Sequence, residues 1–220
     1  MNPAIACLCL AAALSAPLYG QAPARRGRGP FIPNPANELK LDNAKVRVLV
    51  DTELPFETEA PRQHPLNRVL IYLDAGHFTL ESGDGRIEDI QVEAGDVRWS
   101  RPGPPYIIEN RSGHPMRIVE IQLKAPSPGR MTPASPLDPT EVDPAHYKIE
   151  FENPQVRVLR IHFGPHEKSP RHEHQLDRVV LYVNDQGTLK AGDLRMAGPS
   201  THTEENTGDE PADRIAVEIK

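Results

Sequence analysis

The sequence predicts an all-β protein built from two like units. Residues 43–73 align with residues 153–183 at a constant offset of 110 without a gap, and 12 of the 31 aligned pairs are identical. A repeat of this length indicates two copies of one structural unit. Short runs rich in Val, Ile and Tyr are bounded by Gly, Pro, Asp or Asn, as is typical of strands. The 24 prolines disfavour long helices. We therefore expect two small sandwich or barrel units.

The expected strands recur in both copies. In the first copy they cover residues 46–50, 68–73, 77–80, 87–92 and 116–123, and in the second copy residues 156–163, 178–183 and 215–220. Gly95-Asp96 and Gly192-Asp193 form matching turns, each just before a strand. Between strand and turn the second copy is 13 residues shorter, so we expect it to lack about one hairpin.

The chain divides into five segments. Residues 1–22 are apolar and then small, which predicts a signal peptide, with a disordered or membrane-tethered tail as the alternative. Residues 23–37 are a Pro/Gly/Arg-rich leader. The first unit covers residues 38–124, an extended Pro-rich linker residues 125–145, and the second unit residues 146–220. Because Cys7 and Cys9 both lie in the first segment, the mature chain would have no disulfide or thiolate chemistry. We expect an exported protein, periplasmic or extracellular.

Composition narrows the expected partners. The net charge of -6 is spread along the chain, and the only basic cluster lies in the leader, so no nucleic-acid surface is expected. No other apolar run is long enough to span a bilayer. The expected partner is a small molecule. Two fused copies favour a monomer that is an internal pseudo-dimer, with a homodimer as the alternative.

Three histidines of the second copy could bind a metal. His172 and His174 are two residues apart, so on a strand their side chains point to the same face. His202 follows a Gly/Pro turn at Gly198 and precedes Asn206 by four residues, which suits a third ligand from a neighbouring strand. The alternative is that these histidines are merely solvated. The acidic pair Glu204-Glu205 is expected to lie in a solvated loop.

With these residues the chain resembles the cupin superfamily, as a bacterial exported two-domain member (a bicupin). The residues that carry the resemblance are Gly164, His172, His174, Gly198, His202 and Asn206. The resemblance covers nearly all of residues 38–220 as a repeat. It implies two tandem double-stranded β-helix (jelly-roll) barrels, with a divalent metal bound inside the mouth of the C-terminal barrel.

One departure from the family pattern concerns the acidic ligand. The family places a carboxylate at position 178 or 179, where this chain has Arg178 and Val179. Asp177 is one place too early, yet it remains a candidate fourth ligand if a bulge intervenes. Alternatively, Arg178 points inward and holds an anionic ligand. The other residues expected to support the ligands or to touch a bound molecule are Asn206, Tyr182 and His166.

The first copy lacks the histidine set. Arg62, His64 and Tyr106 stand where the second copy has its three histidines, and one imidazole holds a transition metal poorly. We expect a structural half whose interior is filled by Tyr72, Tyr106 and aliphatic side chains. The alternative is a metal-free ligand pocket lined by Arg62, Arg68 and His64.

These observations favour an exported bicupin that binds Fe, Zn, Ni, Cu or Mn through His172, His174 and His202. The metal would polarise or activate a small oxygen-bearing molecule. By resemblance alone, the activity would be dioxygenase-like or isomerase-like. The alternatives are a non-enzymatic module that binds a small molecule or anion, and a structural domain without metal.

Overall fold

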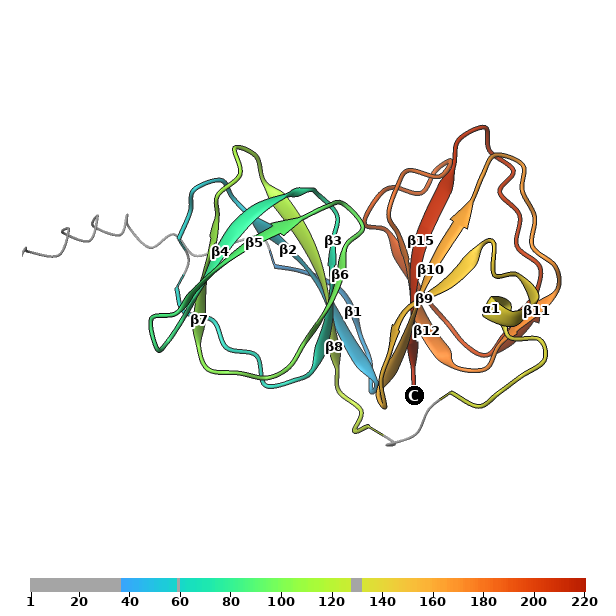
Figure 1. Cartoon of the computed structure of the whole chain (residues 1–220), viewed down its shortest axis with the longest axis horizontal. Coiled ribbons are helices and arrows are strands. Elements are labelled where there is room, and N and C mark those ends of the chain that lie inside the picture. The colour runs from blue at the N-terminus through green and yellow to red at the C-terminus, as the bar shows by residue number, and fades with distance from the viewer. Residues whose placement is uncertain (1–36, 59, 128–131) are drawn as a thin grey trace, which may run out of the picture.

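The structure, a computed structural model, describes residues 37–58, 60–127 and 132–220 (Figure 1). These residues form two β units that lie side by side, as the sequence predicts. The expected signal peptide (1–22) and nearly all of the leader (23–37) lie outside the described residues. Within the described part of the chain, no helix is long and apolar enough to cross a membrane.

The N-terminal unit contains a five-stranded and a three-stranded antiparallel sheet. The first has the order β1-β2-β8-β3-β6 and the second the order β5-β4-β7. The strands are β1 (Glu38–Asp42), β2 (Val46–Glu53), β3 (Arg68–Tyr72), β4 (Gly76–Ser82), β5 (Ile87–Val92), β6 (Val97–Ser100), β7 (Tyr106–Asn110) and β8 (Met116–Leu123).

The C-terminal unit repeats the five-stranded sheet in the equivalent order, β9-β10-β15-β12-β13, and adds the pair β11-β14. Its strands are β9 (Tyr147–Glu152), β10 (Val156–Phe163), β11 (His172–His174), β12 (Asp177–Tyr182), β13 (Leu194–Ala197), β14 (Ser200–His202) and β15 (Ala212–Ile219). Residues 183–193, which replace the β4–β5 hairpin, contain no named strand and pair only through the bridge Gln186–Leu189.

The two five-stranded sheets share one apolar core. Val48 and Val69 of the first copy and Val158 and Val179 of the second are fully buried in a single cluster. Side chains alternate between the two faces of a strand, so these valines face the other unit while their neighbours face into their own unit. The valines shared by the two copies therefore form the contact between the units.

Polar contacts surround this core. Lys45 forms an ion pair with Asp177 across the units. Asn67 donates a hydrogen bond to the Gln155 side chain at 2.9 Å, and Arg160 donates to the Gly95 carbonyl at 2.7 Å. Buried apolar area supplies most of the attraction in such a contact, while these polar pairs fix how the sheets are oriented.

The described part of the Pro-rich linker (residues 125–127 and 132–145) is more structured than the extended segment that the sequence predicts, and residues 128–131 lie outside the described residues. It contains the helix α1 (Pro139–Val142), whose first turn is capped by Asp138. Arg157 on β10 donates to both carboxylate oxygens of Asp138, and the Leu137 carbonyl accepts from the Glu173 amide at 2.7 Å. The first contact attaches the linker to β10, and the second attaches it to β11, the strand that carries His172 and His174.

Candidate metal centre

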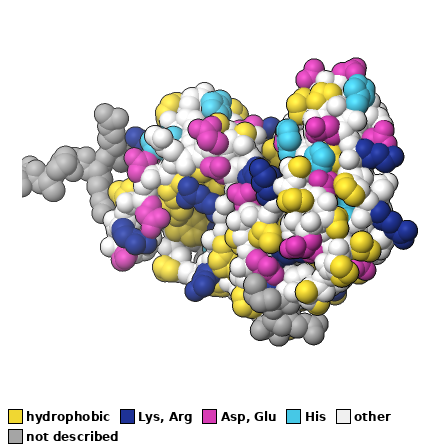
Figure 2. Space-filling view, turned by 45° about the vertical axis from the view of Figure 1, so that its right-hand side comes forward, with side chains coloured by type: hydrophobic (Ala, Val, Ile, Leu, Met, Phe, Trp, Pro, Cys, Tyr) yellow, Lys and Arg dark blue, Asp and Glu magenta, His cyan; other side chains and the backbone are white. Residues whose placement is uncertain are grey.

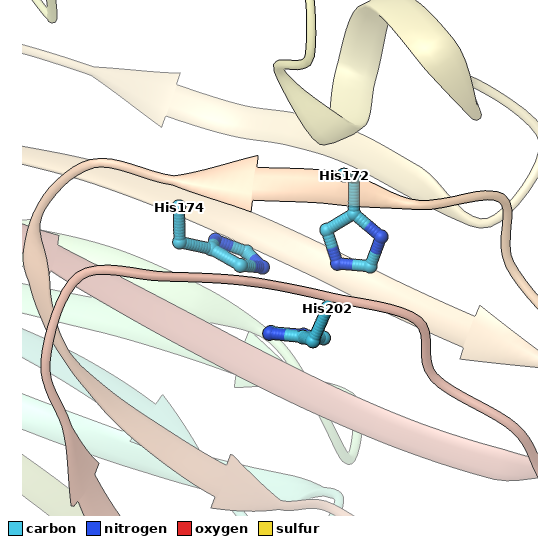
Figure 3. A group of neighbouring side chains, drawn as sticks. All are labelled: His172, His174 and His202. Atoms are coloured by element: carbon cyan, nitrogen blue, oxygen red, sulfur yellow. The ribbon is translucent and has the colours of Figure 1, made fainter.

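The three histidines occupy facing positions on two short strands. β11 and β14 pair antiparallel, with His172 directly opposite His202. His174 lies two residues along β11, so its ring projects from the same face as that of His172. Figure 3 shows the three rings turned toward one space between the strands.

The geometry of the cluster suits a single ion. One ligand nitrogen from each ring lies within 4.8 Å of the others, and within the described residues this is the group able to hold a metal. The ring centres are 4.6 Å (His172–His202), 5.2 Å (His172–His174) and 5.4 Å (His174–His202) apart. Nitrogens bound about 2.1 Å from one ion lie roughly 3–4 Å apart. A movement of the rings toward one another by about an ångström would therefore bring the three nitrogens to the spacing that one ion requires.

Hydrogen bonds at Nδ1 leave Nε2 for a ligand. His172 Nδ1 lies 3.0 Å from the Pro170 carbonyl, and His174 Nδ1 lies 2.8 Å from a Glu218 carboxylate oxygen. A carbonyl or carboxylate can only accept, so each Nδ1 carries the proton and each Nε2 keeps its lone pair. His202 Nδ1 pairs with the Ser200 hydroxyl at 3.2 Å.

Two of these Nε2 atoms are buried without a partner. Within the described residues, no hydrogen-bond partner reaches Nε2 of His172 or of His202. Buried polar atoms are almost always paired, and leaving one unpaired costs about 1–3 kcal/mol. A bound ion would satisfy both atoms at once, so the residues present fit a metal.

Burial also keeps the imidazoles of His172 and His202 neutral, which is the form that binds a metal. Burial and then the neighbouring His174 lower the pKa of His172. Burial lowers the pKa of His202 to about 4, and the other two imidazoles and Arg178 act in the same direction against the charge of Glu204. At neutral pH, both rings therefore offer a lone pair without first losing a proton.

Glu218 on β15 holds His174 in place, and sequence reasoning missed it. Its side chain is only 1% exposed, and one oxygen accepts the His174 proton while the other lies 3.7 Å from Arg157. A carboxylate behind a ligating histidine fixes the ring orientation and raises its basicity. A charged residue within the otherwise apolar run 215–219 was the available signal.

Glu204 is not the solvated loop residue that the sequence suggests. Its side chain is 14% exposed and accepts a hydrogen bond from the Tyr147 hydroxyl at 2.7 Å. Its other oxygen lies 3.7 Å from His202 Nε2 and 3.4 Å from Arg214. Although burial acts to raise it, the pKa of Glu204 is lowered overall by Tyr147 and Arg214, so this carboxylate is ionised beside the cluster. Glu205 is exposed, as expected.

Asp177 does not join the histidines. Its carboxylate forms an ion pair with Lys45 of the other unit, and it is not part of the metal-binding group. Its position at the start of β12 explains this, because its neighbour Arg178 takes the inward-facing position. Arg178 is buried and donates to the Gly198 carbonyl at 2.8 Å and to Ser200 at 3.1 Å. Burial lowers the pKa of Arg178.

The three remaining candidates lie away from the cluster. Asn206 fixes a loop by donating to the carbonyls of Gly164 and Glu210, just as Asn110 does with two carbonyls in the first copy. Tyr182 is buried at the end of β12 with a guanidinium over its ring. His166 is exposed and pairs with Asp209 at 3.0 Å.

The first copy places different chemistry at the same positions. Arg62 and Tyr106 pair across an isolated antiparallel bridge, as His172 and His202 do across β11 and β14. The guanidinium of Arg62 contacts both carboxylate oxygens of Glu53 at 2.8 and 2.9 Å. Tyr72 packs against Phe78, as expected of a filled interior. However, the interior also holds buried charges, which the sequence did not predict.

One of these charges gives the protein a pH-dependent stability. Burial and then the charge of Glu120 raise the pKa of Asp51 to about 7, against the opposing effect of Arg62. An aspartate in the unfolded chain titrates near pH ~4. Between about pH 4 and 7 the folded protein therefore binds more protons at Asp51, and the free energy of unfolding falls as pH rises, by up to about 1.4 kcal/mol per pH unit.

We therefore expect Asp51→Asn to flatten this part of the stability profile. Urea unfolding of both proteins across this pH window measures the difference. Asp89→Asn, whose side chain is 71% exposed, is the control and should keep the wild-type slope. A wild-type slope in Asp51→Asn would show that the carboxyl group is not protonated on folding.

Comparison with known proteins supports the fold. No protein-family model matches the sequence, and no curated protein matches it. Among solved structures, AerE from Microcystis aeruginosa has a TM-score of 0.59 at 13% identity, covering 84% of this chain and 98% of that one. Oxalate decarboxylase from Bacillus subtilis, described for its Mn(II) centres, has a TM-score of 0.57 at 12% identity over 80% of this chain and 69% of that one.

A cupin 2 conserved barrel domain protein from Leptotrichia buccalis is also similar, with a TM-score of 0.52 at 14% identity over 84% of this chain and 88% of that one. The architecture and these similarities define the class of protein. The chain has the cupin fold in two tandem copies, so the resemblance seen in the sequence is confirmed at the level of the fold.

Proposed function

We propose that the C-terminal unit binds one divalent transition-metal ion through Nε2 of His172, His174 and His202 and acts there on a small oxygen-bearing molecule. The observation that carries this is that Nε2 of His172 and of His202 are buried and have no hydrogen-bond partner in the part of the chain that the structure describes. A bound ion would act as a Lewis acid toward a substrate oxygen at the positions that the three histidines leave open. Export of the protein remains part of the proposal.

The surroundings of His202 indicate where the substrate would enter. A cavity of about 410 Å³ adjoins this ring and is also lined by Arg178, Arg195 and Glu204. Two guanidiniums against one carboxylate favour an oxyanion over a cation in this space. Glu204, ionised and 3.7 Å from His202 Nε2, is placed to accept a proton from a substrate held there. We therefore infer that the substrate is a small carboxylate or similar oxyanion.

Metal loading tests the first half of the proposal. The protein is stripped with a chelator, loaded in turn with Mn, Fe, Ni, Cu and Zn, and analysed for metal after desalting. We expect one ion per chain for at least one of them, because a set of three imidazoles binds any of these metals. Manganese is included because the similar oxalate decarboxylase has Mn(II) centres. Failure of every metal to reach stoichiometry would contradict the proposal.

A turnover screen separates an enzyme from a binding module. Each stoichiometric metal form is incubated with small carboxylates, phenolics and sugars, with and without oxygen. We expect consumption of a carboxylate, and a Glu204→Gln variant should lose most of that turnover while keeping its metal. Binding of a carboxylate without turnover would favour the non-enzymatic alternative.

The negative charge of Glu218 should support metal binding through His174. Glu218→Gln keeps an acceptor for His174 Nδ1 but removes the negative charge, so metal affinity should fall by about 10–100-fold. Competition with a chelator of known affinity measures the change. Glu205→Gln, an exposed position in the same unit, should leave the affinity unchanged. Equal affinities in the two variants would show that Glu218 does not support the metal ligand.

A further inference from the structure

The N-terminal unit contains a cavity at the position equivalent to the metal centre. It measures about 240 Å³ and is lined by Arg62, His64 and Tyr106, which occupy the places of the three histidines. A water molecule takes up about 30 Å³, so the space suits a molecule of only a few heavy atoms. The exposed side chains of Asn37 and Gln63 lie at its opening.

The carboxylates of Asp51 and Glu120 line this cavity, and that of Glu53 lies next to it, paired with Arg62. Asp51, Glu53 and Glu120 are 3%, 3% and 6% exposed. The equivalent positions of the second copy are Ile161, Phe163 and Ala216, all buried in an apolar cluster. The same barrel therefore folds without these carboxylates. Since burying a charge is costly, their presence in the first copy calls for a positively charged counterpart.

The described charges around the cavity do not balance. The three carboxylates of Asp51, Glu53 and Glu120 face two guanidiniums, and both of these are engaged. Arg62 holds Glu53 and also lies 3.4 Å from an oxygen of Asp51, and Arg68 holds Glu120. Burial lowers the pKa of His64, whose Nδ1 donates to the Leu66 carbonyl at 3.0 Å, so this ring adds no charge at neutral pH. Among the described residues the carboxylates thus outnumber the guanidiniums by one, which disfavours an anionic ligand.

The unsatisfied atom is an oxygen of Asp51. Within the described residues, no donor reaches its Oδ1, although the carboxyl group is in hydrogen-bonding contact with Glu120. In the empty cavity, a proton shared by the two carboxyl groups offsets the extra negative charge. Within the described residues, no third imidazole or carboxylate joins them closely enough to form a metal-binding group. An ammonium group, with three donors and one charge, meets the same need.

We propose that the N-terminal unit carries a second, metal-free binding site, in which a small primary amine places its ammonium group against the carboxylates of Asp51 and Glu120. Tyr106 supplies a second contact. Its hydroxyl oxygen accepts from Arg68 at 2.7 Å, which leaves its hydrogen for an oxygen of the ligand. The ligand class is therefore a short amine that also carries a hydroxyl or carbonyl oxygen.

Three probes of matched size test the site in the full chain: ethanolamine, ethylene glycol and glycolate. Binding is followed by amide NMR signals from β2 (Val46–Glu53), β7 (Tyr106–Asn110) and β8 (Met116–Leu123). We expect ethanolamine to bind with a dissociation constant on the order of millimolar, as suits so few atoms, and the neutral and anionic probes to bind at least tenfold more weakly. Tighter binding of glycolate, or no saturable binding of ethanolamine, would overturn the proposal.

Proton displacement gives a second readout. Because the pKa of Asp51 is raised to about 7, ethanolamine should bind about fivefold more tightly at pH ~7 than at pH ~6 and then level off at higher pH. Asp51→Asn should weaken binding at least tenfold and remove this dependence, while Asp89→Asn should change neither. If Asp51→Asn fails to fold, Glu120→Gln replaces it. His172→Ala should bind ethanolamine like wild type, so the two sites are tested separately. Unchanged affinity in the Asp51 or Glu120 variant would contradict the proposal.

Discussion

Replacing His172 or His202 with alanine should reduce metal affinity far more than any single change outside the three histidines of the cluster. Each substitution removes one of three ligands from a cluster that within the described residues has no fourth histidine. The loss should exceed the about 10–100-fold effect of removing a supporting residue such as Glu218. Competition with a chelator at neutral pH, where burial keeps His202 neutral, measures the affinity directly.

The controls for this experiment are histidines of the same unit. His162 and His166 are exposed and pair with aspartates at 2.7 and 3.0 Å, outside the cluster. His162→Ala and His166→Ala should retain wild-type affinity. If all four variants bind metal equally, the ion is held adventitiously at the surface and the proposed centre is wrong.

Truncating Leu181 to alanine should destabilise the whole protein, not only the unit that contains it. Leu181 is fully buried in the cluster shared by the two five-stranded sheets. Leu→Ala changes at buried sites cost about 2–5 kcal/mol, because a cavity remains in addition to the lost apolar contact. Since this cluster includes Val48 and Val69 of the other unit, we expect the two units to unfold in one cooperative transition.

Leu189→Ala is the matched control, because the same truncation is made at a side chain that is 37% exposed. Its free energy of unfolding should stay within about 0.5 kcal/mol of wild type. Urea denaturation followed by far-UV circular dichroism and by the fluorescence of Trp99, which packs against the shared cluster, reports both units. Two separate transitions, with only the C-terminal one shifted in Leu181→Ala, would show that the units are stabilised independently.

The strands and the repeat could be predicted because their signals are local. Alternating valines at 46 and 48, repeated at 156 and 158, indicate strands with one apolar face. Which face meets which partner is not local. The valines lie between the units only because the two sheets pack against each other, and the helix α1 forms in a segment whose prolines suggested extended chain.

Part of the candidate site could also be predicted, because the spacing of its histidines is a local signal in the sequence. Spacing along the chain places His172 and His174 on one face, and the turn before His202 suggests a neighbouring strand. Glu218 and Glu204 were missed because their roles depend on contacts across the sheet, with His174 in one case and with Tyr147 and Arg214 in the other. Asp177 was proposed from its sequence position alone, and its ion pair with Lys45 takes it elsewhere.

The distribution of charge on the surface could be predicted from the sequence, whereas the charges in the interior could not. On the face shown in Figure 2, basic and acidic side chains are interspersed, as expected from the evenly spread net charge. Buried charges such as Asp51 and Glu120 are invisible to such reasoning, because composition does not tell which carboxylates face inward. Comparing the two copies position by position recovers part of this information, since apolar residues of the second copy stand where the first has carboxylates.

In the function that we propose, only the C-terminal unit binds a metal. Anomalous X-ray scattering from crystals of the metal-loaded protein tests it most directly. We predict one peak per chain, about 2.0–2.3 Å from Nε2 of His172, His174 and His202, and no peak between Arg62, His64 and Tyr106. A peak among the N-terminal residues, or fully loaded crystals with no peak at the three histidines, would contradict the claim.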